Sequence, residues 1–131
     1  MGLVIDRFDH IVLNCRDVRA TASWYESVLG MAVEQFGPQR RTALKFGGQK
    51  INLRPTGPDE GWATGAADVP GSADLCFITA SRPDEVLAHF ASLGVDVVEG
   101  PVPKTGALGP MTSVYCRDPD GSLVEVASYD G

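Results

Sequence analysis

The chain has 131 residues, of which 44% are hydrophobic and 21% charged, so it has a globular composition and enough length for one domain with its own core. Its 17 acidic and 11 basic residues leave a net charge of −6, which argues against a nucleic-acid partner because phosphates bind basic surfaces. No segment approaches the ~20 consecutive apolar residues of a membrane-spanning helix, so no membrane partner is expected.

The cysteines predict a reducing environment. Cys15, Cys76 and Cys116 stand far apart, are odd in number and form no CxxC pair. Disulfide frameworks use paired cysteines and belong mainly to oxidising compartments, so we expect reduced thiols here. The first ten residues, MGLVIDRFDH, run into a predicted strand and lack the layout of a signal peptide. Together these features predict a cytoplasmic protein.

The first half of the chain has the pattern of one strand, one helix and three more strands. Apolar and polar residues alternate over residues 8–15, as they do in a half-buried strand. Asp17 is a plausible N-cap for a helix whose apolar residues recur at helical spacing, and Gly30 follows where the helix should end. Three short strands are predicted after it, at residues 31–36, 41–46 and 49–53.

The second half repeats this pattern after a segment rich in Gly, Pro and Asp, residues 55–71, which we interpret as a linker. Ser81 and Asp84 flank Pro83 at the expected start of a helix, and Gly94 follows its end. The predicted strands are residues 73–79, 95–99, 112–117 and 123–128, with a loop at 101–110 and a tight turn at 118–121.

Internal similarity supports a duplication. LGMAV, beginning at Leu29, matches LGVDV, beginning at Leu93, and the same shift carries His10 onto Asp74. Duplicated units of this size are each too small to bury a sheet face alone. We therefore predict an α+β fold in one domain spanning residues 1–131. Two βαβββ modules, about 6–54 and 72–129, would form a curved mixed sheet around a cleft.

Polar residues at equivalent strand positions mark the candidate site. The apolar residues of the strands should pack under the helices, which leaves a set of polar residues on the opposite face: His10, Lys50, Asn52, Arg54, Asp74, Cys76 and Glu125. Each of them alone has an ordinary explanation as a strand residue. A carboxylate between valines, however, is costly to bury unless it is paired or bound to a metal, as at Glu125.

Several motifs resemble the vicinal oxygen chelate superfamily. They are DHIVL at 9–13, WYESVLGM at 24–31, DPDG at 118–121 and LVEV at 123–126. This superfamily includes glyoxalase I, extradiol dioxygenases, fosfomycin-resistance thiol transferases, methylmalonyl-CoA epimerase and bleomycin-binding proteins. Residues 46–53, 71–77 and 99–102 resemble its short glyoxalase-domain-containing members more closely. The resemblance covers nearly the whole chain and implies the duplicated βαβββ fold.

The resemblance also implies a divalent metal held by four residues: His10, Asn52, Asp74 and Glu125. His10 and Glu125 match the superfamily pattern, whereas glyoxalase I has a carboxylate at the place of Asn52 and usually a histidine at that of Asp74. An iron site of two histidines and one carboxylate lacks its second histidine, because His89 is expected on the outer face of a helix. A dioxygenase or a thiol transferase is therefore disfavoured. One histidine with oxygen ligands suits Mn²⁺, Ni²⁺, Mg²⁺ or Zn²⁺.

The leading hypothesis is a metal-dependent, glyoxalase-like lyase or isomerase that acts on a small oxygenated metabolite. Glu125 would serve as a metal ligand or as the catalytic base. Basic and aromatic side chains on the same face are predicted to bind the substrate: Lys50, Arg54, Tyr115 and Arg117. The alternative is a metal-free protein that binds a drug or metabolite, as bleomycin-binding relatives do. In either case a homodimer is expected.

Overall fold

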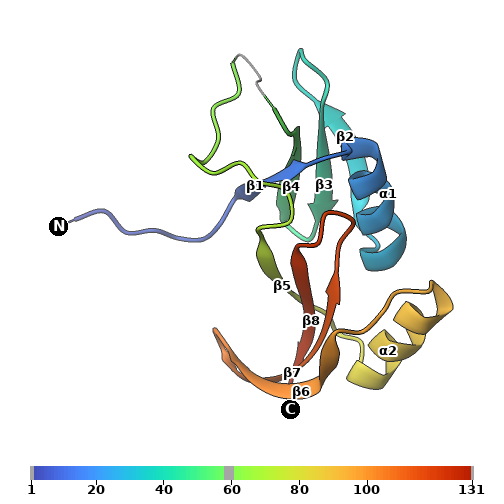
Figure 1. Cartoon of the computed structure of the whole chain (residues 1–131). Helices are drawn as coiled ribbons and strands as arrows, with labels where there is room; N and C mark the ends of the chain where they lie inside the picture. The colour runs from blue at the N-terminus through green and yellow to red at the C-terminus, as the bar shows by residue number, and fades with distance from the viewer. Residues whose placement is uncertain (1, 58–60, 131) are drawn as a thin grey trace. The chain divides into compact units, whose positions relative to one another are not determined.

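The structure is a computed structural model that describes residues 2–57 and 61–130. The chain divides into two compact units, Met1–Val69 and Pro70–Gly131. Each unit contains a four-stranded mixed sheet and one helix, in the order strand, helix and three strands. Figure 1 shows the two units with their elements labelled. The α+β class and the repeated βαβββ pattern are therefore confirmed.

In the first unit, the strands are β1 (His10–Cys15), β2 (Ala32–Phe36), β3 (Arg41–Phe46) and β4 (Gln49–Pro55). Their order in the sheet is β1-β4-β3-β2, with β1 parallel to β4 and the other pairs antiparallel. The parallel pair requires a crossover, which the helix α1 (Val18–Leu29) provides. Side chains from one sheet face and from α1 form the buried core: Leu13, Tyr25, Val28, Leu44, Ile51 and Leu53.

Both predicted ends of α1 are confirmed. The Asp17 carboxylate accepts a hydrogen bond from the backbone N–H of Ala20 at 3.1 Å and so caps the first turn. Gly30 adopts a left-handed conformation with φ of 68°, and its N–H donates to the Glu26 carbonyl at 3.1 Å. Residues close in sequence thus determine where α1 begins after β1 and where it ends before β2.

The second unit repeats the arrangement with β5 (Asp74–Ile78), α2 (Pro83–Ser92), β6 (Glu99–Gly106), β7 (Gly109–Arg117) and β8 (Leu123–Tyr129). The sheet order is β5-β8-β7-β6, and only the β5–β8 pair is parallel. At the start of α2 the N-cap is Arg82, not Ser81, and its backbone N–H donates to the Glu85 carboxylate at 2.8 Å. The predicted turn at 118–121 is present, since Asp118 Oδ1 accepts from the N–H groups of Asp120 and Ser122.

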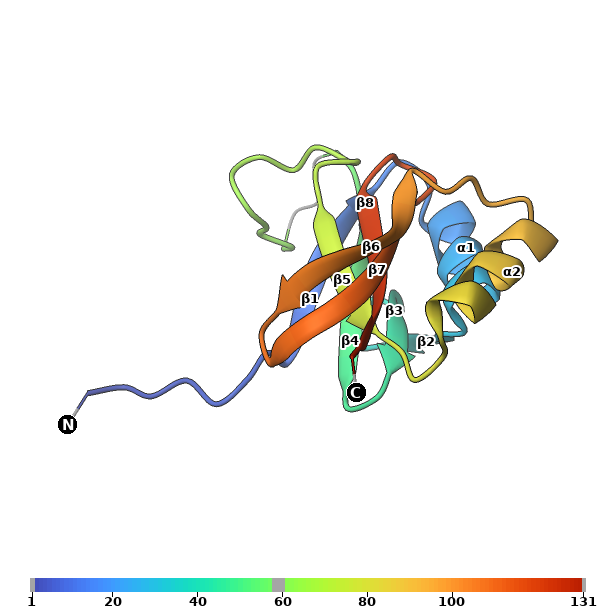
Figure 2. The same ribbon diagram turned by 90° about the horizontal axis from the view of Figure 1, so that it is seen from below.

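One predicted strand and one predicted loop are wrong. We expected a strand at residues 95–99 and a loop at 101–110, whereas β6 begins at Glu99 and forms a long hairpin with β7 across most of that loop. The hairpin is visible in Figure 2 as the orange ribbon formed by β6 and β7. Pro101 and Pro103 suggested a loop because proline cannot donate to a strand ladder. β6 is an edge strand, and its outer side needs no donors.

The helices in the described part of the chain are α1, with 12 residues, and α2, with 10. Neither is long and apolar enough to cross a membrane. The single-domain organisation of residues 1–131 and the cleft stay predictions.

Candidate functional site

On the first sheet, the face away from α1 carries the predicted polar residues. β1 and β4 run parallel with His10 beside Lys50, Val12 beside Asn52 and Asn14 beside Arg54. Since side chains alternate along a strand, these three pairs share one face, whereas Leu13 and Leu53 share the α1 side. The two-residue periodicity of the sequence therefore predicted this face.

His10, the first residue of β1, has 42% of its side chain exposed. Its Nδ1 lies 2.8 Å from the Asp9 carboxylate, and this hydrogen bond lowers the pKa of Asp9. A carboxylate on one ring nitrogen fixes the imidazole and directs the other nitrogen, Nε2, towards a ligand. This contact lies at the surface, since 88% of the Asp9 side chain is exposed, so it holds the ring only weakly.

Asn52 is 6% exposed, and its Oδ1 is a buried side-chain atom with no hydrogen-bond partner among the described residues. Burying an amide oxygen without a partner costs about 1–3 kcal/mol, so such atoms are rare in folded proteins. An oxygen of this kind can accept a hydrogen bond or act as a metal ligand. It is the most unusual polar atom on this face.

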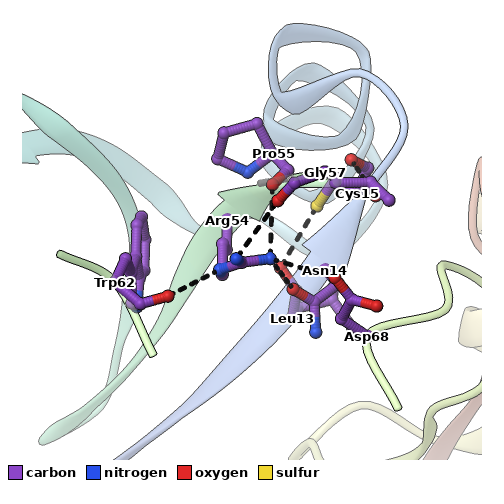
Figure 3. A network of polar contacts seen from close by, with 9 residues as sticks. Leu13, Asn14, Cys15, Arg54, Pro55, Gly57, Trp62 and Asp68 are labelled. Carbon is purple, nitrogen blue, oxygen red and sulfur yellow. Dashed lines mark hydrogen bonds and ion pairs between the residues drawn. The ribbon is translucent and has the colours of Figure 1, made fainter. Parts of the chain in front are cut away.

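Lys50 and Arg54, both predicted to bind substrate, are engaged within the first unit. Lys50 Nζ lies 3.8 Å from the centroid of the Phe36 ring. Arg54 is 4% exposed, and its guanidinium donates to the Asn14 side chain at 3.1 Å and to the carbonyls of Trp62 and Gly57 at 3.2 and 3.3 Å (Figure 3). Its Nη1 also lies 3.5 Å from the Asp68 carboxylate. These contacts join β1, β4 and the segment after β4.

On the second sheet, Glu125 is the centre of a polar cluster. It is 9% exposed and lies on β8 between Cys76 of β5 and Tyr115 of β7 in the strand register. Ser113, which is fully buried two residues from Tyr115, donates its hydroxyl to Glu125 Oε2 at 2.5 Å. A buried carboxylate is stabilised when it accepts hydrogen bonds in this way. We call these four residues the Glu125 cluster.

The neighbours of Glu125 are held in their protonated forms. Burial, a hydrogen bond to Glu125 and the negative charges of Glu125 and Glu99 raise the pKa of Tyr115 to about 12. Desolvation and the nearby Glu125 charge raise the pKa of the Cys76 thiol to about 11. Near neutral pH, a phenol, a thiol and a hydroxyl therefore surround one carboxylate. Such an arrangement can bind and transfer protons, but it does not favour a thiolate nucleophile.

The remaining predicted residues lie at the margins of the second sheet. Asp74, the first residue of β5, is exposed. Arg117, the last residue of β7, is also exposed, and its Nη1 donates to the Gly121 carbonyl at 3.1 Å across the turn. Asp74 and Arg117 each lie beside Leu123 in the register and so share the face of Glu125.

Two residues with clear roles were missed in the sequence. Ser113 alternates with Tyr115 along β7, so the period of two already placed it on the face of Glu125. Trp62 lies in the predicted linker yet is only 8% exposed, and a large aromatic residue within a polar segment is itself a sign of burial. His89, by contrast, is exposed on α2 as expected.

A comparison with protein-family models gives a match over residues 7–126 to the family described as glyoxalase/bleomycin resistance protein/dioxygenase superfamily. The chain belongs to this superfamily. A curated relative, virulence protein STM3117 of Salmonella typhimurium, is 46% identical over 127 residues, which cover 97% of this chain and 87% of the relative. Glyoxalase domain-containing protein RDO1 of Mycosarcoma maydis is also 46% identical over 127 residues, with coverages of 97% and 70%.

Solved structures of the superfamily agree with this fold. An integron cassette protein from Vibrio cholerae matches with a TM-score of 0.94 and 45% identity, over 99% of this chain and all of that chain. A lactoylglutathione lyase from Agrobacterium tumefaciens matches with a TM-score of 0.70 and 26% identity, over 95% of each chain. An antibiotic-binding protein from a Streptomyces species has a TM-score of 0.76 at 19% identity, over 98% of this chain and all of that chain, a likeness of fold alone.

Superfamily members often bind a divalent metal, so we compared the donors of this chain with that requirement. No three residues of the types His, Cys, Asp and Glu lie close enough to hold an ion within residues 2–57 and 61–130. The predicted ligands lie two in each unit: His10 and Asn52 in the first, Asp74 and Glu125 in the second. Their chemistry fits a hard divalent ion, because they offer one imidazole nitrogen and three oxygens, including the unpartnered Asn52 Oδ1.

Proposed function

We propose that this protein is a divalent-metal-dependent enzyme of the glyoxalase type, a lyase or isomerase acting on a small oxygenated metabolite. The observation that carries the proposal is the buried Asn52 Oδ1, which has no partner among the described residues and shares a sheet face with His10. A buried oxygen of this kind is normally completed by water, a metal or another ligand. Membership of the superfamily adds support.

In this proposal His10 would bind the ion through Nε2 and Asn52 and Asp74 would contribute oxygens, while Glu125, which could serve as a ligand or as the base, would act as the base. A bound divalent ion would polarise a substrate carbonyl and so acidify the neighbouring C–H group. Asp9 would help to orient the His10 ring through the 2.8 Å hydrogen bond to Nδ1. The identity of the ion, among Mn²⁺, Ni²⁺, Mg²⁺ and Zn²⁺, is left to the experiment.

The Glu125 cluster would supply the proton chemistry. We propose that one carboxylate oxygen of Glu125 accepts a proton from the substrate carbon and returns it to the adjacent carbon, while Ser113 holds the other oxygen. Tyr115, whose pKa is raised to about 12, stays protonated, and its hydrogen bond to Glu125 would position that carboxylate. Substrate contacts from Lys50 and Arg117 remain part of the proposal. The contacts of Arg54 favour an anchoring role for that residue.

Metal analysis tests the proposal. Protein purified without chelator and then saturated with Mn²⁺, Ni²⁺ or Zn²⁺ should retain about one equivalent of one of these ions, and His10→Ala should lose it. His89→Ala is the matched control, because it removes the chain's other histidine from an exposed position on α2 and should leave binding unchanged. Retention below about a tenth of an equivalent with all three ions, or equal loss in both variants, would reject the proposal.

A second candidate function is metal-free binding of a drug or metabolite. The Glu125 cluster favours it, because Ser113 already satisfies the carboxylate and Tyr115 and Cys76 stay protonated beside it, so no ion is needed to stabilise it. Calorimetric binding of a metabolite that survives both chelator and Glu125→Gln would support this function. Catalytic turnover of any substrate would exclude it.

We further propose that the protein acts as a homodimer. Apolar side chains before β1 are strongly exposed: Leu3 at 89%, Val4 at 85%, Ile5 at 75% and Phe8 at 76%. Exposed apolar groups so close together are typical of a surface that another chain covers. A cytoplasmic location also stays a prediction, based on the odd number and wide spacing of Cys15, Cys76 and Cys116.

A further inference from the structure

The first unit contains a cavity that the proposed function does not use. Its volume is about 370 Å³, and it lies where α1 and β3 begin and β4 ends. Four apolar or aromatic residues form part of its wall: Val18, Leu53, Pro55 and Trp62. Leu53 points to the α1 side of the sheet, because it alternates with Asn52 and Arg54. Arg41 alternates with Thr42, the partner of Leu53, so the cavity lies at the ends of β3 and β4 and not on one face, and its described lining includes neither His10 nor Asn52.

The rest of the wall is polar and positively charged. Gln39, Arg40, Arg41 and Thr42, from the β2–β3 turn and the start of β3, complete the lining. Among the described residues of the lining, Arg40 and Arg41 are the charged ones, in a chain whose net charge is −6. Salt screens the repulsion between a bound anion and acidic residues elsewhere on the protein, whereas arginines that line the cavity lie close enough to attract the anion. This part of the cavity therefore favours anions.

Arg41 is held in place by a stacking contact and a hydrogen bond. Its Cζ lies 4.0 Å from the centroid of the Trp62 ring, and its Nη2 donates to the Gly61 carbonyl at 3.4 Å. Neither Arg41 nor Arg40 forms an ion pair with residues 2–57 or 61–130, although Arg40 donates to the Gln35 side chain at 2.7 Å. A stacked guanidinium keeps its plane fixed and can offer two parallel N–H groups to a carboxylate.

A buried hydrogen bond holds Trp62, which forms another part of the cavity wall. The backbone carbonyl of Trp62 accepts a hydrogen bond from the buried Arg54 Nε at 3.2 Å, which ties the tryptophan to β4 (Figure 3). The Trp62 ring thus presents an apolar surface whose position the core determines. A cavity with a fixed apolar wall and a fixed cation is preorganised for a ligand that has both characters.

We propose that this cavity binds a small organic anion, a monocarboxylate with a planar apolar body. The carboxylate would take a bidentate pair of hydrogen bonds from Arg41, and the body would pack against Val18, Pro55 and the exposed part of Trp62. The volume is near the lower end of the range for ligand pockets, about 300–1,000 Å³, so a single-ring acid suits it better than a nucleotide. Inorganic phosphate would satisfy the arginine but would leave the apolar wall exposed to water.

Benzoate is the probe, and NMR titration of ¹⁵N-labelled protein is the measurement. Saturable binding is expected, with the largest shifts at the Trp62 indole N–H, Thr42 and Leu53 and none in the Glu125 cluster. Benzamide, the neutral isostere, and inorganic phosphate should each bind at least about 10-fold more weakly. This comparison uses the unaltered protein and so does not depend on any variant folding.

A variant pair completes the test. Arg41→Gln should weaken benzoate binding at least about 10-fold, whereas Arg19→Gln, which removes an exposed arginine of α1 that does not line the cavity, should leave it unchanged. The proposal is overturned if benzoate shows no saturable binding up to about 20 mM. Equal binding of benzamide or phosphate, or shifts centred outside the cavity, would overturn it as well.

Discussion

Replacement of Arg54 by methionine removes the guanidinium that joins β1, β4 and the segment around Trp62. Methionine is a suitable substitution because it fills much of the same volume and adds no polar group. In the native protein the guanidinium is almost fully buried and makes three hydrogen bonds of 3.1–3.3 Å, to the Asn14 side chain and the carbonyls of Trp62 and Gly57 (Figure 3).

The expected cost follows from these three bonds. Each hydrogen bond contributes about 1 kcal/mol net, and the acceptors left behind must recruit water or stay unsatisfied. The contact with Asp68 adds little, because 44% of that side chain is exposed and solvent screens it. The 3.5 Å contact with the Pro55 carbonyl is at the limit of a hydrogen bond. We expect a loss of about 3 kcal/mol, close to the range for disrupting a buried charged network.

Hydrogen exchange is the appropriate assay, because it reports each unit separately. Amides of β4 and of its parallel partner β1 should exchange about 100-fold faster in Arg54→Met, which corresponds to ~3 kcal/mol at a factor of ten per 1.4 kcal/mol. Amides of β8 in the second unit serve as an internal reference and should not change. Arg19→Met applies the same substitution to an exposed arginine and should have no effect beyond about 0.5 kcal/mol.

A role for Arg54 in holding these strands together is refuted if Arg54→Met leaves the protection of β1 and β4 within about threefold of the native protein. It is also refuted if Arg19→Met has an equal effect. Arg54→Lys should fall between the two, since lysine keeps the charge but cannot reproduce the planar arrangement of donors.

Two further predictions concern the thiol of Cys76 and the residues before β1. Cys76 is the exposed cysteine, and its pKa is raised from 9.0 to about 11. At pH 8 its alkylation by iodoacetamide should therefore be about 100-fold slower than in the unfolded chain, and the rate should rise with pH until about pH 11. Glu125→Gln should speed the reaction roughly 3–10-fold, since desolvation, the larger cause of the shift, remains; an unchanged rate would contradict the assigned charge effect. Deletion of residues 2–8 removes exposed Leu3, Val4, Ile5 and Phe8 and should weaken a homodimer at least about 100-fold in analytical ultracentrifugation, because each covered apolar side chain contributes about 1.5 kcal/mol or more. A native protein that is monomeric at about 100 μM would remove the basis of the homodimer proposal.

Much of the fold was predictable because its signals are local. Asp17 and Gly30 fix the two ends of α1 through bonds to residues three and four positions away, and the alternation in β1 and β4 determines which side chains face α1. The similarity of the segments at Leu29 and Leu93 revealed the second unit without any tertiary information. The prediction of a loop at 101–110 was wrong because it depended on a feature that is not local. Whether a strand tolerates proline depends on its place in the sheet, and β6 lies at an edge.

In the candidate site, too, some features were predictable from local sequence and others depend on the tertiary structure. Sequence periodicity placed His10, Asn52, Asp74 and Glu125 on the faces away from the helices, and strand register confirms that placement within each unit. Whether these residues bind a metal stays a prediction. Periodicity did not identify Ser113 as the donor to Glu125, although it placed that residue on the correct face. Cross-strand neighbours depend on register, which residues far apart in the chain determine together.

The sequence by itself determined the duplicated βαβββ pattern, the helix ends and the polar faces, because each depends on residues close together in the chain. Tertiary structure decided the environment of individual side chains. Arg54 was expected to bind substrate from an open face, yet the segment around Trp62 folds over it and occupies its guanidinium. Burial and long-range hydrogen bonds arise only when distant segments meet, and they determine whether a charged residue holds the fold together or remains available to a ligand.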